Sequence, residues 1–222
     1  MHTSLKRLNL IKKNVNEIIS SKQLNNKPKI IAVTKMFPMN IIKPLLDEGH
    51  LHFGENKIQE AESKWFNIRS KYNNLQLHMI GKLQSNKAKK AVKLFDYIHS
   101  LDSKKLAFKI NQYEKELNKK TKLFIQVNIG KEEQKNGISL DDVKSFYNYC
   151  TNELSLNIIG LMCLPPIKKD TEKYFDLIEK KSIELNLKDL SIGMSSDYNS
   201  ALLFGATFLR LGESIFGRRE VK

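Results

Sequence analysis

The 222-residue chain has two cysteines, no long apolar run and little arginine, and each scarcity excludes a class of protein. Cys150 and Cys163 stand far apart and outside metal-binding or redox spacing, so we expect free thiols in a reducing compartment, the cytoplasm. No apolar stretch approaches the ~20 residues that a membrane helix needs. The first 22 residues carry apolar side chains at helical spacing, unlike the unbroken apolar block of a signal peptide.

Arginine is scarce in a chain that is strongly basic. The net charge is +14, yet five of the 38 basic residues are arginine, and lysine is spread over every segment. Proteins that read nucleic-acid grooves favour the forked guanidinium, whereas lysine presents a solvated point charge. We therefore expect a soluble lysine-rich surface. A nucleic-acid site is the less favoured alternative.

What the sequence does contain is a regular alternation of two kinds of segment. Eight short apolar runs have the composition of buried strands: residues 29–35, 51–55, 75–81, 96–102, 122–128, 158–164, 190–195 and 207–212. Segments with helical periodicity lie between them: residues 41–48, 56–72, 86–95, 103–118, 140–152, 170–185 and 198–204.

This order predicts the fold class. Strands that alternate with helices are typically parallel and joined by crossover helices, and eight such units in one chain predict a closed (β/α)₈ TIM barrel. No linker or low-complexity tract divides the sequence, so we expect a single domain over residues 1–222, with an extra helix within residues 1–27 packing on the barrel. A doubly wound open sheet is the structural alternative.

A lysine ends the first apolar run, "KIIAVTK". Burying an ammonium group costs several kcal/mol unless the group is paired with an opposite charge or hydrogen-bonded. In a barrel, Lys35 falls at the carboxyl end of a strand, where catalytic groups gather. Apolar neighbours that lower its pKa would leave a neutral amine able to attack an aldehyde. The alternative is a lysine that extends into solvent from a strand end.

Two later runs end in glycine and serine. "GMSSD" (Gly193–Asp197) and "RLGES" (Arg210–Ser214) follow the seventh and eighth predicted strands, where barrels commonly bind phosphate. Ser195 and Ser214 would add hydroxyl donors. Each motif by itself is also explained by a tight turn and a helix cap at Ser195, Ser196 or Asp197. Two such loops beside Lys35 favour a site for a phosphorylated aldehyde.

Arg210, at the end of the eighth strand, supplies a permanent cation. It can contact phosphate or a ring nitrogen of a bound cofactor. The alternative is a buried ion pair with Glu55 or Asp197.

The remaining polar residues have simpler interpretations. His50 and His52 lack a third ligand at metal spacing, so no metal site is expected and a structural role is favoured. His78 and His99 are interpreted as core or rim residues. Gln84, Ser85 and Asn86 are expected to cap the helix that begins there.

Eight motifs in unbroken order, from about Lys29 to Arg219, carry a family resemblance. They are "IAVTK", "HFGENKIQE", "HMIGKLQSNK", "SLDS", "VNIGKEEQKNGI", "GLMCLPP", "SIGMSSD" and "RLGESIFGRR". Together they resemble the single-barrel pyridoxal phosphate (PLP) homeostasis proteins of the YggS/PROSC type. The resemblance implies a fold-type III PLP barrel like the N-terminal domain of alanine racemase.

The resemblance also implies a role for each site residue. Lys35 would form the internal aldimine with PLP, and Arg210 would meet the pyridine nitrogen. The phosphate cradle would be "GMSS" and "GES", which contain Ser195, Ser196, Gly212 and Ser214. Asn56 and Met194 would line the cofactor. Glu213 departs from the expected small hydroxyl residue, and its charge should turn it away from a phosphate.

Arginine beside the pyridine nitrogen restrains the chemistry. PLP is the strongest electron sink when that nitrogen is protonated beside a carboxylate, and arginine cannot accept the proton. The related racemases take a second base from an added C-terminal domain, for which the sequence after the eighth strand leaves no room. We expect a monomeric cytoplasmic protein that holds PLP, hands it to apoenzymes and turns over amino acids slowly or not at all. The alternatives are a PLP-dependent amino-acid racemase and a Schiff-base aldolase.

Overall fold

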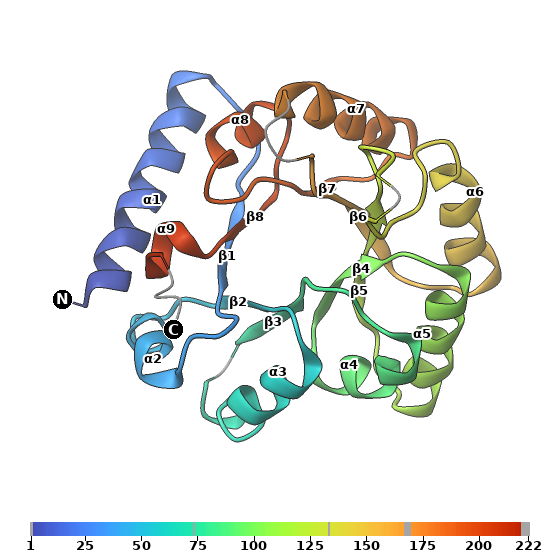
Figure 1. The fold of residues 1–222 in the computed structure, drawn as a ribbon, viewed down its shortest axis with the longest axis horizontal. Coiled ribbons are helices and arrows are strands. Elements are labelled where there is room, and N and C mark those ends of the chain that lie inside the picture. The colour runs from blue at the N-terminus through green and yellow to red at the C-terminus, as the bar shows by residue number, and fades with distance from the viewer. Residues whose placement is uncertain (1, 73, 133, 167–169, 219–222) are drawn as a thin grey trace.

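A computed structural model describes residues 2–72, 74–132, 134–166 and 170–218. Eight parallel strands close into a barrel in sequence order, with helices around the outside (Figure 1). The strands are β1 (Lys29–Val33), β2 (His52–Glu55), β3 (Gln76–Met79), β4 (Tyr97–Leu101), β5 (Lys122–Val127), β6 (Ile158–Cys163), β7 (Asp189–Ser191) and β8 (Phe208–Leu211). The predicted barrel is confirmed, and the open sheet is excluded because β1 pairs with β8.

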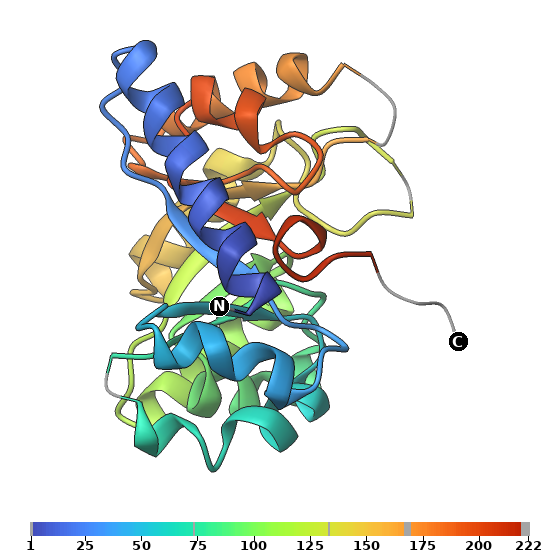
Figure 2. The ribbon, with the colours of Figure 1, turned by 90° about the vertical axis from the view of Figure 1, so that its left-hand side faces the viewer.

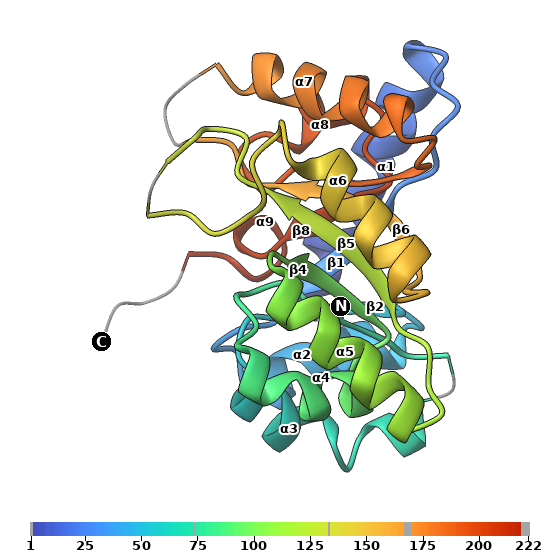
Figure 3. The same cartoon turned by 90° about the vertical axis from the view of Figure 1, so that its right-hand side faces the viewer.

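The helices fall where the periodicity predicted them. They are α1 (Thr3–Ser21), α2 (Met39–Asp47), α3 (Ile58–Trp65), α4 (Ala88–Leu94), α5 (Lys104–Glu116), α6 (Val143–Asn148), α7 (Thr171–Glu184), α8 (Tyr198–Leu203) and α9 (Glu213–Phe216). Short 3₁₀ turns at Arg69–Lys71 and Ser85–Lys87 and a π-helical turn at Tyr149–Glu153 complete the connections. Figure 3 shows α5 and α6 lying over the outside of the strands.

The extra N-terminal helix α1 lies against the seam of the barrel. Its buried side chains include Leu8, Ile11 and Val15, which recur at helical spacing and join the main apolar core. The helix contacts α2, α8 and α9, and it runs past α9 in Figure 2. The first and last helices of the described chain therefore pack together next to the β1–β8 seam.

The core has two parts. A large cluster fills the space between the strands and the outer helices. A smaller cluster of Ile31, Tyr97, Phe124, Met162 and Phe208 takes one residue from each of five strands, and we assign it to the barrel interior because alternate strand residues face opposite sides.

The structure also bears on the predictions for the cysteines, for the helix cap at residues 84–86 and for membrane-spanning helices. Both cysteines are free, as expected, and both are buried. The predicted cap at residues 84–86 is wrong: Gln84 precedes the 3₁₀ turn and Lys87 precedes α4, and neither side chain makes a capping hydrogen bond. No described helix combines the length and apolarity that crossing a membrane requires.

Candidate functional site

Lys35 lies in the turn that follows β1, at the carboxyl end of the barrel. The strand ends at Val33, two residues earlier than the apolar run suggested. Thr34 is buried, Lys35 is half-buried, and Met36 has a φ of +65°. This left-handed residue turns the chain sharply at the barrel rim.

A cavity of about 410 cubic ångströms opens beside this turn. It is lined by Val33, Lys35, Asn56, Ile80, Leu164, Met194, Ser195, Ser196, Arg210, Gly212 and Glu213. Seven of the eight residues predicted for the cofactor site are in this set. A larger cavity, of about 750 cubic ångströms, lies between α1 and the amino ends of β1 and β2, away from the loops that carry the predicted motifs.

The loop after β7 needs glycine at its second position. Gly193 has a φ of +89°, and a Cβ there would lie 2.8 Å from Cβ of Ala201 and 2.9 Å from Cδ2 of Leu209. Asp197 precedes α8, but its Oδ1 accepts from the backbone N–H of Met194 at 2.6 Å and does not cap the helix. The polar side chain thus shapes the loop itself, and the alternative interpretation of Asp197 as a side-chain cap of α8 is wrong.

Ser214 differs in place from the prediction. It does not line the cavity; its hydroxyl lies 3.0 Å from that of Ser195, and its backbone N–H donates to the Ser195 Oγ at 3.1 Å. Ser195 therefore ties the β7 loop to the start of α9. The two predicted serine loops are joined at the cavity wall.

Arg210 points a buried guanidinium at the cavity. Its side chain donates to the carbonyl and hydroxyl of Ser191, the latter at 2.6 Å, and to the Cys163 carbonyl at 2.9 Å. Burial lowers the pKa of Arg210 to about 10, which still leaves a cation at neutral pH. The alternative of an ion pair is wrong for both candidates, since Arg210 forms a salt bridge with neither Glu55 nor Asp197.

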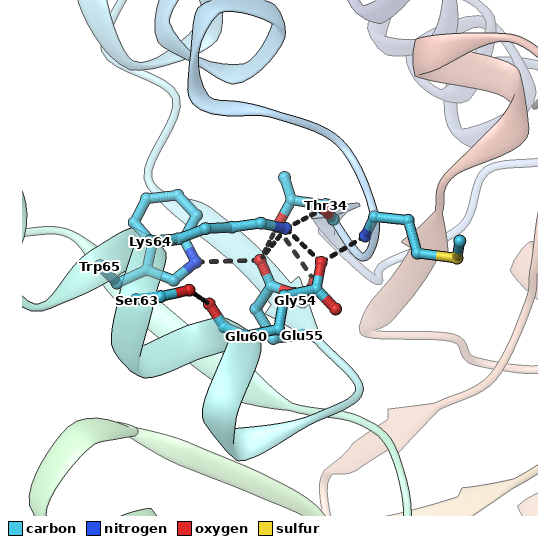
Figure 4. A network of polar contacts seen from close by, with 8 residues as sticks. Thr34, Gly54, Glu55, Glu60, Ser63, Lys64 and Trp65 are labelled. Carbon is cyan, nitrogen blue, oxygen red and sulfur yellow. Dashed lines mark hydrogen bonds and ion pairs between the residues drawn. The ribbon is translucent and has the colours of Figure 1, made fainter.

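Glu55 instead belongs to a buried network next to Lys35 (Figure 4). Its Oε1 accepts from the Thr34 hydroxyl at 2.7 Å, the Trp65 indole N–H at 3.0 Å and the Lys64 ammonium at 3.2 Å. The Glu55 side chain has no exposed surface, and that of Lys64 is 13% exposed. These bonds connect β1, β2 and α3.

Lys64 and Glu60 extend this network onto the backbone around Lys35. Lys64 donates to the Thr34 carbonyl and to the Glu60 carboxylate, each at 2.6 Å, and the backbone N–H of Met36 donates to the same Glu60 oxygen. Both neighbours of Lys35 are thereby fixed in place. This network was not predicted from the sequence; the Glu60–Lys64 spacing of four residues was the available signal.

Asn56 lies where the ends of β2 and β3 come close together. A Cβ on Gly81 would lie 2.3 Å from the backbone oxygen of Asn56, so a larger residue at 81 would displace this loop. Asn56 itself is half-buried and lines the cavity. Its side-chain amide offers both a donor and an acceptor to a bound molecule.

Glu213 borders the cavity, although we expected it to face away. Its carboxylate accepts from Nε of Arg218 at 3.0 Å, and both side chains are mostly exposed. The same glutamate lines a smaller hollow with Phe37, Gly217 and Arg218. Arg218 therefore pairs with the Glu213 charge on the outer side of the cavity opening. Among the described residues no His, Cys, Asp and Glu cluster could hold a metal ion.

Comparison with known proteins agrees with this geometry. Residues 7–220 match the family described as "Alanine racemase, N-terminal domain". The chain is 34% identical over 223 residues to the pyridoxal phosphate homeostasis protein of Haemophilus influenzae, covering 96% of this chain and 94% of that protein. It is 33% identical over 204 residues to the protein of the same name from Aquifex aeolicus, covering 88% and 89%.

Solved structures show the same fold. PipY of Synechococcus elongatus, solved without and with PLP, is 34% identical, with TM-scores of 0.81 and 0.79 over 91% of this chain and all of that chain. Alanine racemase of Clostridium difficile, at 15% identity and a TM-score of 0.72, shares the fold over 58% of its own length. The chain belongs to the alanine racemase N-terminal domain family, and within it to the pyridoxal phosphate homeostasis proteins.

Proposed function

We propose that this protein binds PLP covalently through Nζ of Lys35 and holds it for use elsewhere in the cell. The observation that carries the proposal is the meeting of Lys35, Arg210 and the β7 serine loop around one cavity. These groups come from opposite ends of the sequence, and only closure of the barrel brings them together.

The donors suit the three functional parts of PLP. The Lys35 amine can condense with the aldehyde and release water. The Arg210 guanidinium is a donor that suits an unprotonated ring nitrogen, and Ser195 and Ser196 offer hydroxyls to the phosphate. When bound, PLP supplies an electron sink for amino-acid chemistry, which an arginine at the ring nitrogen weakens.

The cavity favours holding over turnover. Racemisation needs a base on each face of the substrate. Among the described residues that line the cavity, the titratable side chains are Lys35, Arg210 and Glu213, and the last is paired with Arg218. We therefore propose a cytoplasmic, monomeric carrier that affects amino-acid and keto-acid balance by giving PLP to apoenzymes. The names of its relatives and the PLP-bound PipY structure support this role.

Visible absorbance during titration with PLP tests the proposal. We expect a yellow protein whose band is absent from Lys35→Ala. Lys82→Ala is the matched control, because Lys82 is an exposed lysine that lines a different cavity. A band that persists in Lys35→Ala would contradict the assignment.

The alternative functions have their own signatures. A Schiff-base aldolase would be colourless and would be trapped by borohydride with a sugar phosphate instead of PLP. A racemase would interconvert amino-acid enantiomers at a robust rate once loaded with PLP. We expect neither result.

A further inference from the structure

Three histidines form a continuous hydrogen-bonded column through the barrel interior. Nδ1 of His52 lies 2.9 Å from Nε2 of His78, and Nδ1 of His78 lies 2.9 Å from Nε2 of His99. Nδ1 of His99 lies 2.8 Å from the Ser191 hydroxyl, which also accepts from Arg210 at 2.6 Å. The column therefore joins the amino ends of the strands to the floor of the proposed PLP cavity.

The rings are held by stacking as well as by hydrogen bonds. His78 stacks on Tyr97 with 4.3 Å between ring centres and 12° between planes, and His99 stacks on Phe124 at 4.3 Å and 16°. Both histidines have no exposed surface. Each ring thus has a single orientation in which its two nitrogens face the next members of the column.

Arg210 sets the direction of every hydrogen bond in the column. A guanidinium can only donate, so the Ser191 oxygen must accept from it. Within the described chain the serine has one further side-chain partner, Nδ1 of His99, so its own proton goes there. His99 must then carry its proton on Nε2.

The proton on His99 Nε2 fixes the proton positions of the other two histidines. Nε2–H of His99 donates to His78, and Nε2–H of His78 donates to His52. His52 is half-buried and lines the cavity of about 750 cubic ångströms at the amino ends of the strands, so its own Nε2–H can donate to water. All three imidazoles are thereby neutral Nε2–H tautomers.

This direction suits Arg210, a buried cation with no carboxylate partner among the residues that the structure describes. Every imidazole turns its acceptor nitrogen toward Arg210 and its N–H away, so the ring dipoles are aligned to stabilise the positive charge. A proton added to the column would place a second positive charge beside the guanidinium. Desolvation, and next the neighbouring charge of Arg210, hold the pKa of His99 well below its usual value.

We propose that His78 and His99, acting through Ser191, are positioning residues that keep Arg210 charged and fixed in one orientation toward the cofactor ring. This inference rests on the proposed function for its purpose, but the column itself belongs to the chain without PLP. A histidine that only fills the core can adopt either tautomer, and its hydrogen bonds can run in either direction. The proposed role requires one tautomer and one hydrogen-bond direction at both His78 and His99.

Nitrogen-15 NMR of the full chain, labelled in its histidines and measured without PLP, tests the direction. We expect His78 and His99 to show a protonated Nε2 and an unprotonated Nδ1 at pH 7, with exposed His2 giving the comparison signal of an imidazole outside the barrel. A protonated Nδ1 at either residue, a mixture of tautomers or an imidazolium would overturn the proposal. This result does not depend on whether the protein binds PLP.

A pair of variants at His99 tests the effect on the cavity. His99→Gln keeps an acceptor for Ser191 and a donor for His78, whereas His99→Phe keeps only the stacking on Phe124. We expect PLP to bind His99→Phe about tenfold more weakly than the wild type, and His99→Gln within about twofold of it. Equal affinities for the two variants would overturn the proposal.

A second position keeps the test decisive if His99→Phe does not fold. His78→Phe retains the stack on Tyr97 and removes the partner of His99 Nε2. We expect weaker PLP binding, with His99 still protonated on Nε2, because Ser191 continues to donate to its Nδ1. A proton on Nδ1 of His99 in this variant would count against the proposal. If the wild type fails to bind PLP, the proposed function fails, and the tautomers still decide whether the column is directional.

Discussion

Ile31 of β1 stands opposite Arg210 of β8 across the seam that closes the barrel. The pairing continues with Ala32 opposite Leu211, so the turn that carries Lys35 follows directly beside Gly212. The first and last strands therefore supply the amine and the guanidinium of one cavity. The site depends on this register, since a slip of one residue would turn the Arg210 side chain out of the barrel.

Breaking the buried network behind Lys35 should destabilise the fold strongly. Lys64→Met leaves the fully buried Glu55 without its cation, and removing one partner of a buried pair costs about 3–5 kcal/mol. Urea denaturation measures this loss. PLP attachment should weaken too, because Lys64 also holds the Thr34 carbonyl next to Lys35.

The matched control for that change is Lys90→Met. Lys90 pairs with Glu62 at 2.8 Å, but the lysine side chain is 54% exposed. Exposed pairs contribute about 0–1 kcal/mol. Similar losses for the two variants would mean that the network around Glu55 has no special role.

Removing the Ser195 hydroxyl should weaken the grip on a phosphate group. Ser195→Ala also breaks the link to Ser214 between the two loops. We expect binding of PLP to weaken by about tenfold, and binding of pyridoxal, which lacks the phosphate, to change little. Isothermal titration with both compounds measures the difference.

Exposed Ser145 on α6 provides the control for the serine change. Ser145→Ala should leave both affinities unaltered. If Ser195→Ala weakened PLP and pyridoxal equally, the phosphate would have to lie elsewhere.

The free energy of unfolding should fall as the pH drops below about 6.5. Burial lowers the pKa of His50 to about 3 and that of His52 to about 4, and it holds the pKa of His78 and His99 well below the usual value. In the unfolded chain these histidines bind protons near pH 6.5, whereas in the folded chain they stay neutral at that pH. Each such histidine then removes about 1.4 kcal/mol per pH unit between its two pKa values.

Nearby charges act in the same direction as burial, with one exception. Lys12 lowers the pKa of His50, Lys29 and Lys122 lower that of His52, and Asp96 opposes them. Urea denaturation between pH 6.5 and 5 measures the slope, and His52→Gln should reduce it by about 1 kcal/mol per pH unit, because the unfolded histidine is only half protonated at pH 6.5. A stability that does not change over this range would show that the histidines take up protons in the folded protein.

Much of the fold could be predicted from the sequence because the signals were local. Eight β-branched runs separated by helical segments indicate parallel strands, and eight units indicate closure. The end of β1 was placed two residues late because the apolar run continues through Thr34, whereas Met36 takes a left-handed conformation that the pattern does not reveal.

The site could be predicted only where its residues sit at strand ends. Lys35 and Arg210 follow from that rule, but the partners of Glu55 and the histidine column do not. His52, His78 and His99 come from three strands, and their contact depends on the stagger between those strands. Sequence spacing does not reveal that stagger, so His52 was assigned a structural role, and His78 and His99 were interpreted as core or rim residues, without any contact among them.

The most direct test of the central claim is to identify which lysine PLP modifies. The protein is loaded with PLP, reduced with borohydride, digested and mapped by mass spectrometry. Lysine is abundant in this chain, so selectivity is informative. We predict one predominant modified peptide, with PLP on Lys35, and its loss when inorganic phosphate competes at high concentration. Modification spread over surface lysines, with Lys35 left unmodified, would contradict the account.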